Sequence, residues 1–272
     1  MDIAENMSRE QKEYLESLEK GKKRVRLARI LILTAFFALW ELFARTGIID
    51  PFIFSSPSRI MACLIQMSAD GSIFRHIGIT LFETCAGFVL GTATGTAGAV
   101  LLWWNEPLRK VLDPYLVVLN SLPKTALAPI IIVWIGNNMS SIIVTALLTS
   151  VIVTLLSVLA GFMAVEEDKI LLARTFGAAK PRILRYVVFP ASVPAIMNAL
   201  KINVGLSFVG VMVGEFLVAG AGLGYLIVYG SQVFKLDWVM LSVLILALMA
   251  ALMYKCVAGL EKRFTQRWKE KE

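Results

Sequence analysis

Residues 125–165 read TALAPIIIVWIGNNMSSIIVTALLTSVIVTLLSVLAGFMAV and contain no Asp, Glu, Lys or Arg. A helix needs about 20 mainly apolar residues to cross roughly 30 Å of hydrocarbon, so this run is long enough for two membrane spans. The polar tetrad Asn137–Ser140 is the natural hairpin between them. We therefore predict spans over about Tyr115–Ile135 and Ser141–Ala164.

Four more stretches have the length and composition of spans: about Ile30–Ile48, Ile77–Trp104, Ile202–Val218 and Trp238–Tyr254. Of the 272 residues, 57% are hydrophobic and 17% charged, and the mean hydropathy is +0.72. Soluble domains carry about 25% charged residues, so most of this chain faces lipid or other apolar helices. The composition excludes a disordered, fibrous or disulfide-built protein. It predicts an all-α, polytopic membrane protein with six transmembrane helices.

The basic residues predict the orientation of the chain. Six spans place both ends on one side, and that side holds 22 of the 27 Lys and Arg residues. Excess positive charge marks the cytoplasmic face, so both termini are expected in the cytoplasm. The net charge of +7 is then explained by the orientation of the chain in the membrane. Nucleic-acid binding would need a basic face on a folded soluble domain, and the sequence contains none, so this function is rejected.

These assignments divide the chain into an N-terminal tail (1–29), a transmembrane domain (30–259) and a C-terminal tail (260–272). Within the first tail, Tyr14, Leu15 and Leu18 suggest a short amphipathic helix stopped by Gly21. That helix is either a docking element for a membrane surface or partner, or simply part of a solvated cytoplasmic tail. The second interpretation is preferred.

The segment 165–201, which we call the elbow, is the longest internal cytoplasmic loop, and its coupling loop covers 165–200. Asp168 can N-cap a helix that begins at the next residue, and Gly177 can end that helix in the left-handed conformation. Pro181 suits the first turn of a second helix. Two prolines then break the chain before the fifth span, Pro190 and Pro194.

The elbow resembles the EAA loop of binding-protein-dependent ABC importer permeases. Ala173, Gly177 and Pro190 fall on the spacing of that loop, with Phe189 in place of the usual Leu. Leu171 and Leu172 replace the Glu and the first Ala, which removes one polar contact of the family pattern.

Other motifs extend the resemblance over nearly the whole chain outside the N-terminal tail. They are similar to the branch that transports nitrate, sulfonates, taurine and bicarbonate, whose members also transport pyrimidine precursors of thiamine. In chain order they are Trp40–Leu42, Phe54–Ser58, Leu122–Pro129 and Gly222–Ile227.

This resemblance implies a plasma-membrane (inner-membrane) permease subunit in a homodimer that encloses one pathway. It also implies an external solute-binding protein and ATP-binding subunits that hold ATP and Mg²⁺. No Gly-x-x-x-x-Gly-Lys-Ser/Thr motif occurs in this chain, so we expect no cofactor and no enzymatic activity here. The resemblance assigns coupling to the ATPase to eight residues: Leu171, Leu172, Ala173, Arg174, Phe176, Gly177, Ala178 and Pro190.

Ionisable residues inside or beside spans should face the protein interior or water, because a charge against lipid costs several kcal/mol. Lys124 and Glu215 either line the pathway or form internal pairs and hydrogen bonds, and the sequence leaves both alternatives open. Packing is the preferred interpretation for Glu41 and Glu83. Pro123 and Pro129 break the helix of the third span. Broken helices are tolerated where they meet protein or a water-filled cavity, which supports this span as a pathway helix. The candidate pathway residues are Asn120, Lys124, Asn203, Ser207 and Glu215.

Small residues in the second span indicate close helix packing, and they are Gly87, Gly91, Gly95 and Gly98. The glycine-rich stretch Gly220–Gly224 is read as a turn, because no strand precedes it and no acidic residue follows it as a dinucleotide loop requires. His76, the only histidine, excludes a His-based metal site and is expected at the membrane interface.

A small anion such as a sulfonate or nitrate is the first expectation for the solute, because Lys124 offers positive charge. A pyrimidine thiamine precursor is the alternative, since Glu83 and Glu215 do not favour an anion. A different class, an ATP-independent secondary transporter or channel, would favour internal inverted repeats, and none is apparent. A membrane-embedded enzyme is disfavoured because no catalytic cluster occurs.

Overall fold

A computed structural model describes the backbone of residues 9–269 and the side chains of 18, 20, 21 and 23–263. Residues 1–8 and 270–272 of the predicted tails lie outside the described residues. The chain divides into two compact units, Met1–Cys63 and Leu64–Glu272, and each is described by itself.

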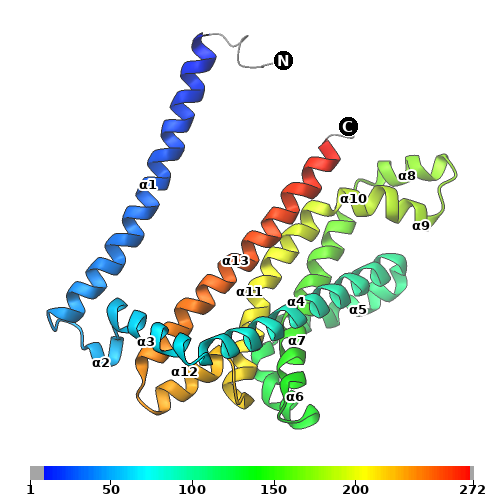
Figure 1. The fold of residues 1–272 in the computed structure, drawn as a ribbon. Helices are drawn as coiled ribbons and strands as arrows, with labels where there is room; N and C mark the ends of the chain where they lie inside the picture. The colour runs from blue at the N-terminus through cyan, green and yellow to red at the C-terminus, as the bar shows by residue number, and fades with distance from the viewer. Residues whose placement is uncertain (1–8, 270–272) are drawn as a thin grey trace. The chain divides into compact units, whose positions relative to one another are not determined.

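Every regular element within residues 9–269 is helical (Figure 1). The elements are α1 (Arg9–Arg45), α2 (Pro51–Phe54), α3 (Pro57–Ala69), α4 (Ser72–Trp104), α5 (Glu106–Ser121), the 3₁₀ turn η2 (Lys124–Leu127), α6 (Ala128–Ile135), α7 (Met139–Met163), α8 (Glu167–Thr175), α9 (Lys180–Ile183), the π-helical turn η3 (Leu184–Val188), α10 (Phe189–Ala191), α11 (Val193–Val218), α12 (Leu223–Gln232) and α13 (Leu236–Lys269).

In the first unit, α1 runs without a break through Gly21, so the predicted stop at this residue is wrong. A glycine inside a helix costs only about 1 kcal/mol relative to alanine, and the neighbouring Lys, Arg, Glu and Leu residues favour the helix. The predicted tail boundary at 29/30 falls inside α1, and that at 259/260 falls inside α13. The side chains of Tyr14 and Leu15 are outside the described set, while Leu18 is exposed.

Two sequence motifs of the first unit contact each other through Glu41. Its Oε2 accepts the Ser58 backbone N–H at 3.0 Å, and its Oε1 accepts Arg45 Nε at 2.7 Å. Ser58 lies in the first turn of α3, where backbone N–H groups lack partners within the helix. A carboxylate is well suited to this position. The packing interpretation of Glu41 is therefore confirmed.

The second unit is built around α4, α7 and α11. Ala146 of α7 lies between two glycines: a Cβ added to Gly87 of α4 would lie 2.6 Å from the Ala146 Cβ, and one added to Gly210 of α11 would meet Ala146 backbone atoms. A Cβ on Gly95 would likewise lie 2.6 Å from the Thr154 Cβ. Absent side chains let these backbones approach closely, which confirms the packing interpretation of the α4 glycines.

Five helices of the described chain are long and apolar enough to cross a membrane: Lys23–Arg45, Ser72–Trp104, Met139–Met163, Val193–Val218 and Leu236–Arg263. A sixth span exists only if α5 and α6 count as one, because they meet at an angle of 87°. The third span predicted over Tyr115–Ile135 is therefore broken and not a single straight helix, as its prolines indicated. The bend falls at Leu122–Pro123, where the extended backbone of both residues interrupts the helix.

Two further differences concern prolines and short helices. Pro190 and Pro194 do not break the chain. Pro194 lies in the first turn of α11, where proline's missing N–H has no partner to lose. Pro190 follows directly on the π-helical turn η3, and the backbone stays helical on both sides of it. The fifth span therefore begins at Val193, nine residues before the predicted Ile202. The two helices α3 and α12 were not among the predicted elements.

Candidate functional site

The elbow begins with α8, whose N-cap is Glu166 and not the predicted Asp168. Asp168 lies in the first turn of α8, beside Glu167, where both acidic side chains complement the positive end of the helix. The Glu166 side chain makes no capping hydrogen bond and pairs instead with Lys169 at 3.1 Å.

The C-terminal end of α8 is closed by Gly177, which has φ of +75° as predicted. Its N–H donates to the Arg174 carbonyl at 2.9 Å, and the Ala178 N–H donates to the Ala173 carbonyl at 3.1 Å. These two bonds define a Schellman motif. The motif reverses the chain at a residue that no neighbour crowds, since a Cβ on Gly177 would meet nothing within 4 Å.

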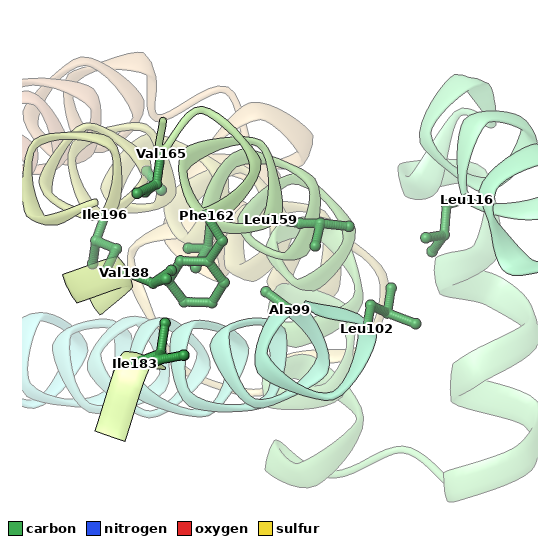
Figure 2. Packing of buried hydrophobic residues seen from close by; sticks show 11 residues of the cluster. Ala99, Leu102, Leu116, Leu159, Phe162, Val165, Ile183, Val188 and Ile196 are labelled. Carbon is green, nitrogen blue, oxygen red and sulfur yellow. The ribbon is translucent and has the colours of Figure 1, made fainter. Parts of the chain in front are cut away.

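The second half of the elbow packs into the helix bundle. Pro181 lies in the first turn of α9, as predicted. Ile183 of α9 and Val188 of η3 are buried in one cluster with Phe162 of α7 and Ala99 of α4. Figure 2 shows Ile183 and Val188 gathered around the Phe162 ring. The elbow is therefore a projecting element whose base belongs to the core.

The first half of the elbow has two unlike faces. Ala173 and Ala178 pack against the buried cluster, whereas Leu171 and Leu172 are each 59% exposed and Phe176 is 83% exposed. A hollow of about 370 Å³ lies beside α8, lined by Glu167, Asp168, Ile170, Leu171 and Arg174. Of the eight predicted coupling residues, Pro190 lies apart from this face, half-buried in α10.

Two side-chain contacts fasten the elbow to the bundle. Lys180 Nζ donates to the Trp104 carbonyl at 2.5 Å and lies 5.6 Å from the ring centroids of Trp103 and Trp104. Ser192 Oγ donates to the Gly161 carbonyl at 2.9 Å. These contacts join the elbow to the ends of α4, α7 and α11.

The candidate pathway residues form two groups that the structure does not bring together. The first lies at the bend between α5 and α6, where Lys124 Nζ donates to the Asn120 carbonyl at 2.9 Å. The second group is fully or almost fully buried among α4, α7 and α11, and it comprises Asn203, Ser207 and Glu215.

Hydrogen bonds account for only part of this second group. Asn203 Nδ2 donates to Thr92 Oγ1 at 3.1 Å and to Thr154 Oγ1, but Asn203 Oδ1 and Ser207 Oγ have no partner in the described part of the chain. Unpaired buried polar atoms are costly, so these two atoms are available to a water molecule or to a different arrangement of the helices.

Glu215 joins α11 to α4 and α12. Its Oε1 accepts the Thr80 hydroxyl at 2.6 Å, its Oε2 accepts the Gly224 N–H at 2.5 Å, and Thr80 Oγ1 accepts the Leu223 N–H at 2.8 Å. Glu83 is also buried beside it, and its Oε2 has no partner among the described residues. Glu215 thus forms interhelical hydrogen bonds, which is one of the two alternatives that the sequence left open. It makes no ion pair with Lys124 in the described part of the chain.

Replacing Glu215 with alanine is expected to lower the thermal stability of the purified protein in detergent. The change orphans the Thr80 hydroxyl and the Gly224 N–H, and each buried donor left unpaired costs about 1–3 kcal/mol. Glu106, which pairs on the surface with Lys110 at 2.9 Å, is the control, because Glu106→Ala should shift the melting temperature little. Equal shifts for the two variants would contradict the assigned role of Glu215.

The glycine-rich stretch before α12 is a turn up to Gly222, as predicted, and α12 begins at Leu223. Gly222 has φ of +122°, and its N–H donates to His76 Nδ1 at 2.9 Å. The His76 ring stacks on Tyr225 at 6.0 Å. His76 therefore holds this turn, a role that sequence reasoning missed because nothing in the spacing links residues 146 positions apart.

The described residues contain no group of three His, Cys, Asp or Glu side chains placed to hold a metal ion. A bundle of apolar helices with an exposed, capped elbow at one end defines an integral membrane protein of the transport class. Residues 84–270 match the family model of the binding-protein-dependent transport system inner membrane component.

Curated relatives extend this match along nearly the whole chain. A probable ABC transporter permease protein of Haemophilus influenzae is 30% identical over 89% of this chain and 98% of its own. The formylaminopyrimidine transport permease protein ThiX of Halalkalibacterium halodurans is 31% identical over 88% and 96%. A putative aliphatic sulfonates transport permease protein, SsuC of Bacillus subtilis, is 24% identical over 92% and 90%.

A solved structure, the inward-facing MetNI methionine ABC transporter, shares the fold with a TM-score of 0.61 at 18% identity, over 72% of this chain and 98% of the other. The protein belongs to the binding-protein-dependent ABC transporter permeases.

Proposed function

We propose that this chain forms the solute pathway of an ABC importer and that a separate ATP-binding subunit drives it through the elbow. The observation that carries the proposal is the exposed apolar face at Leu171, Leu172 and the C-cap Phe176 of α8. The other face of this helix packs against the buried cluster through Ile170 and Ala173. Large apolar side chains anchor protein interfaces when they are buried by a partner. The adjacent hollow beside Arg174 offers room for such a partner's side chain.

The proposed complex holds two copies of this chain, two ATP-binding subunits that bind ATP and Mg²⁺, and an external solute-binding protein. The distribution of the basic residues supports placing both termini and the elbow in the cytoplasm. Val133 and Trp134 of α6 are each 81% exposed, and they provide apolar surface for the second copy or for lipid.

In the proposed mechanism, ATP-driven closure of the ATPases displaces both elbows and opens the pathway outward, and hydrolysis resets it. Reversing a conformational ratio from 1:99 to 99:1 requires about 5.5 kcal/mol of differential binding. A loose loop could not transmit this free energy. The Schellman turn at Gly177 and the Lys180–Trp104 hydrogen bond provide the firm connection that the mechanism needs.

For the solute, we propose a small anion such as a sulfonate, with a pyrimidine thiamine precursor as the second candidate. Lys124 at the bend between α5 and α6 supports the anion. The similarity to ThiX and the burial of Glu83 and Glu215 support the pyrimidine. Calorimetry on the binding protein encoded beside this chain, with taurine and with formylaminopyrimidine as ligands, distinguishes the two.

Replacing Phe176 with alanine is expected to reduce the ATP-binding subunit that co-purifies with the tagged chain at least tenfold, because truncating a central aromatic anchor costs about 2 kcal/mol or more. Lys169→Ala is the matched control on the same helix, since its exposed pair with Glu166 contributes little. Retention of the ATPase by Phe176→Ala, or solute transport by vesicles that contain this chain alone, would overturn the proposal. The second result would favour an ATP-independent transporter.

A further inference from the structure

A cavity of about 300 Å³ lies at the end of the second unit opposite the elbow. It opens between the C-terminal part of α3, the start of α4, α12 and the start of α13. Figure 1 shows α12 at one end of this unit and α8 and α9 at the other. A cytoplasmic elbow therefore places this cavity on the external side. Its volume is at the lower limit of small-molecule sites and matches a single side chain better than a larger solute.

Aromatic rings form one wall of the cavity. His76, Tyr225, Tyr229 and Trp238 follow one another as a ladder, with successive ring centroids 6.0, 5.5 and 6.2 Å apart. Lys235 Nζ lies 4.3 Å from the Trp238 ring centroid, so that ring is already occupied by a cation. Tyr225 and Tyr229 remain for a second cation, since aromatic rings attract ammonium and guanidinium groups.

A carboxylate lines the same cavity. Asp70 Oδ1 accepts the Ser72 hydroxyl at 2.6 Å and the Ser72 N–H at 2.9 Å. These hydrogen bonds hold the pKa of Asp70 below its ordinary value, so this exposed carboxylate is ionised at neutral pH. The neighbouring His76 accepts a hydrogen bond from the Gly222 N–H through Nδ1, so this nitrogen carries no proton and His76 adds no positive charge to the cavity.

We propose that this cavity receives an arginine side chain of the external solute-binding protein, with the guanidinium between Asp70 and the rings of Tyr225 and Tyr229. A guanidinium is planar, stacks on aromatic rings and pairs with a carboxylate through two parallel hydrogen bonds, so it uses both features at once. A zwitterionic amino acid fits less well, because its carboxylate would face Asp70. The inference rests on the proposed function, which supplies the binding protein.

The test uses the full chain in lipid nanodiscs and measures binding by ligand-observed NMR. The probe is Nα-acetyl-arginine amide, which resembles an arginine within a protein. Its citrulline counterpart has the same shape without the charge, and free arginine represents a solute. We expect the arginine amide to bind more tightly than both. Asp70→Asn keeps an oxygen that accepts the Ser72 bonds and should weaken binding about fivefold, the size expected for an exposed ion pair.

Tyr229→Ala should also weaken binding, and Asp113→Asn on α5, which lies outside the cavity, should not. Equal binding of the citrulline amide, or unchanged binding by Asp70→Asn, would overturn the proposal. Tighter binding of free arginine would assign the cavity to a solute and equally overturn it. Co-purification of the ATP-binding subunit does not depend on this cavity, so loss of that interaction would contradict the proposed function separately.

Discussion

Replacing Gly177 with proline is expected to leave the protein inserted in the membrane and to abolish its coupling to the ATP-binding subunit. Gly177 has φ of +75°, whereas proline is fixed near −65°. Proline also removes the N–H that donates to the Arg174 carbonyl. Both changes dismantle the Schellman turn and reorient α8, so we expect at least a tenfold loss of co-purified ATPase and of ATP-dependent uptake.

Gly177→Asn is the matched control, because asparagine keeps the N–H and tolerates the left-handed conformation better than other non-glycine residues. It should retain most of the coupling. The melting temperature of Gly177→Pro should stay near that of the wild type, since this turn is exposed and uncrowded. Normal uptake by Gly177→Pro would show that the elbow is not the coupling element.

Gly210→Ala and Gly205→Ala, two identical changes in α11, are expected to shift stability in opposite directions. A Cβ at Gly210 would lie 3.0 Å from the Ala146 backbone nitrogen and 3.1 Å from the Thr145 carbonyl oxygen. Backbone atoms cannot rotate away, so the helices must separate, at a cost of about 1–3 kcal/mol. A Cβ at Gly205 would meet nothing within 4 Å, and alanine favours the helix by up to about 1 kcal/mol.

The apparent melting temperature of each variant in the same detergent gives the comparison. Gly210→Leu should fail to accumulate in the membrane, since the larger side chain must displace α7 altogether. Should both alanine variants melt at the same temperature, the close approach of α11 to α7 would not contribute to stability.

Local rules predicted the features that depend on a few neighbouring residues. Gly177 takes the left-handed conformation and Pro181 begins a helix, because both outcomes follow from each residue's own backbone freedom. The α4 glycines were also placed correctly in a helix–helix interface, because small residues on one face of a membrane helix let a neighbouring backbone approach closely. The all-helical membrane fold likewise followed from the length of the apolar runs.

Features that depend on distant partners could not be predicted in this way. The bond between His76 and Gly222 and that between Glu41 and Ser58 require knowledge of which helices meet. The prolines of the third span indicated a broken helix, but not that its two parts meet at 87°. A local rule also failed at Asp168, which was expected to cap α8 because a short acidic side chain favours that position, whereas the helix begins one residue earlier, at Glu167.

Ala146, held between Gly87 of α4 and Gly210 of α11, has a consequence for how such a transporter changes state. Three backbones that meet this closely at one residue cannot slide past each other without a clash, so we expect α4, α7 and α11 to move as one rigid body. In the proposed mechanism, the pathway would then open where this rigid body meets the other helices.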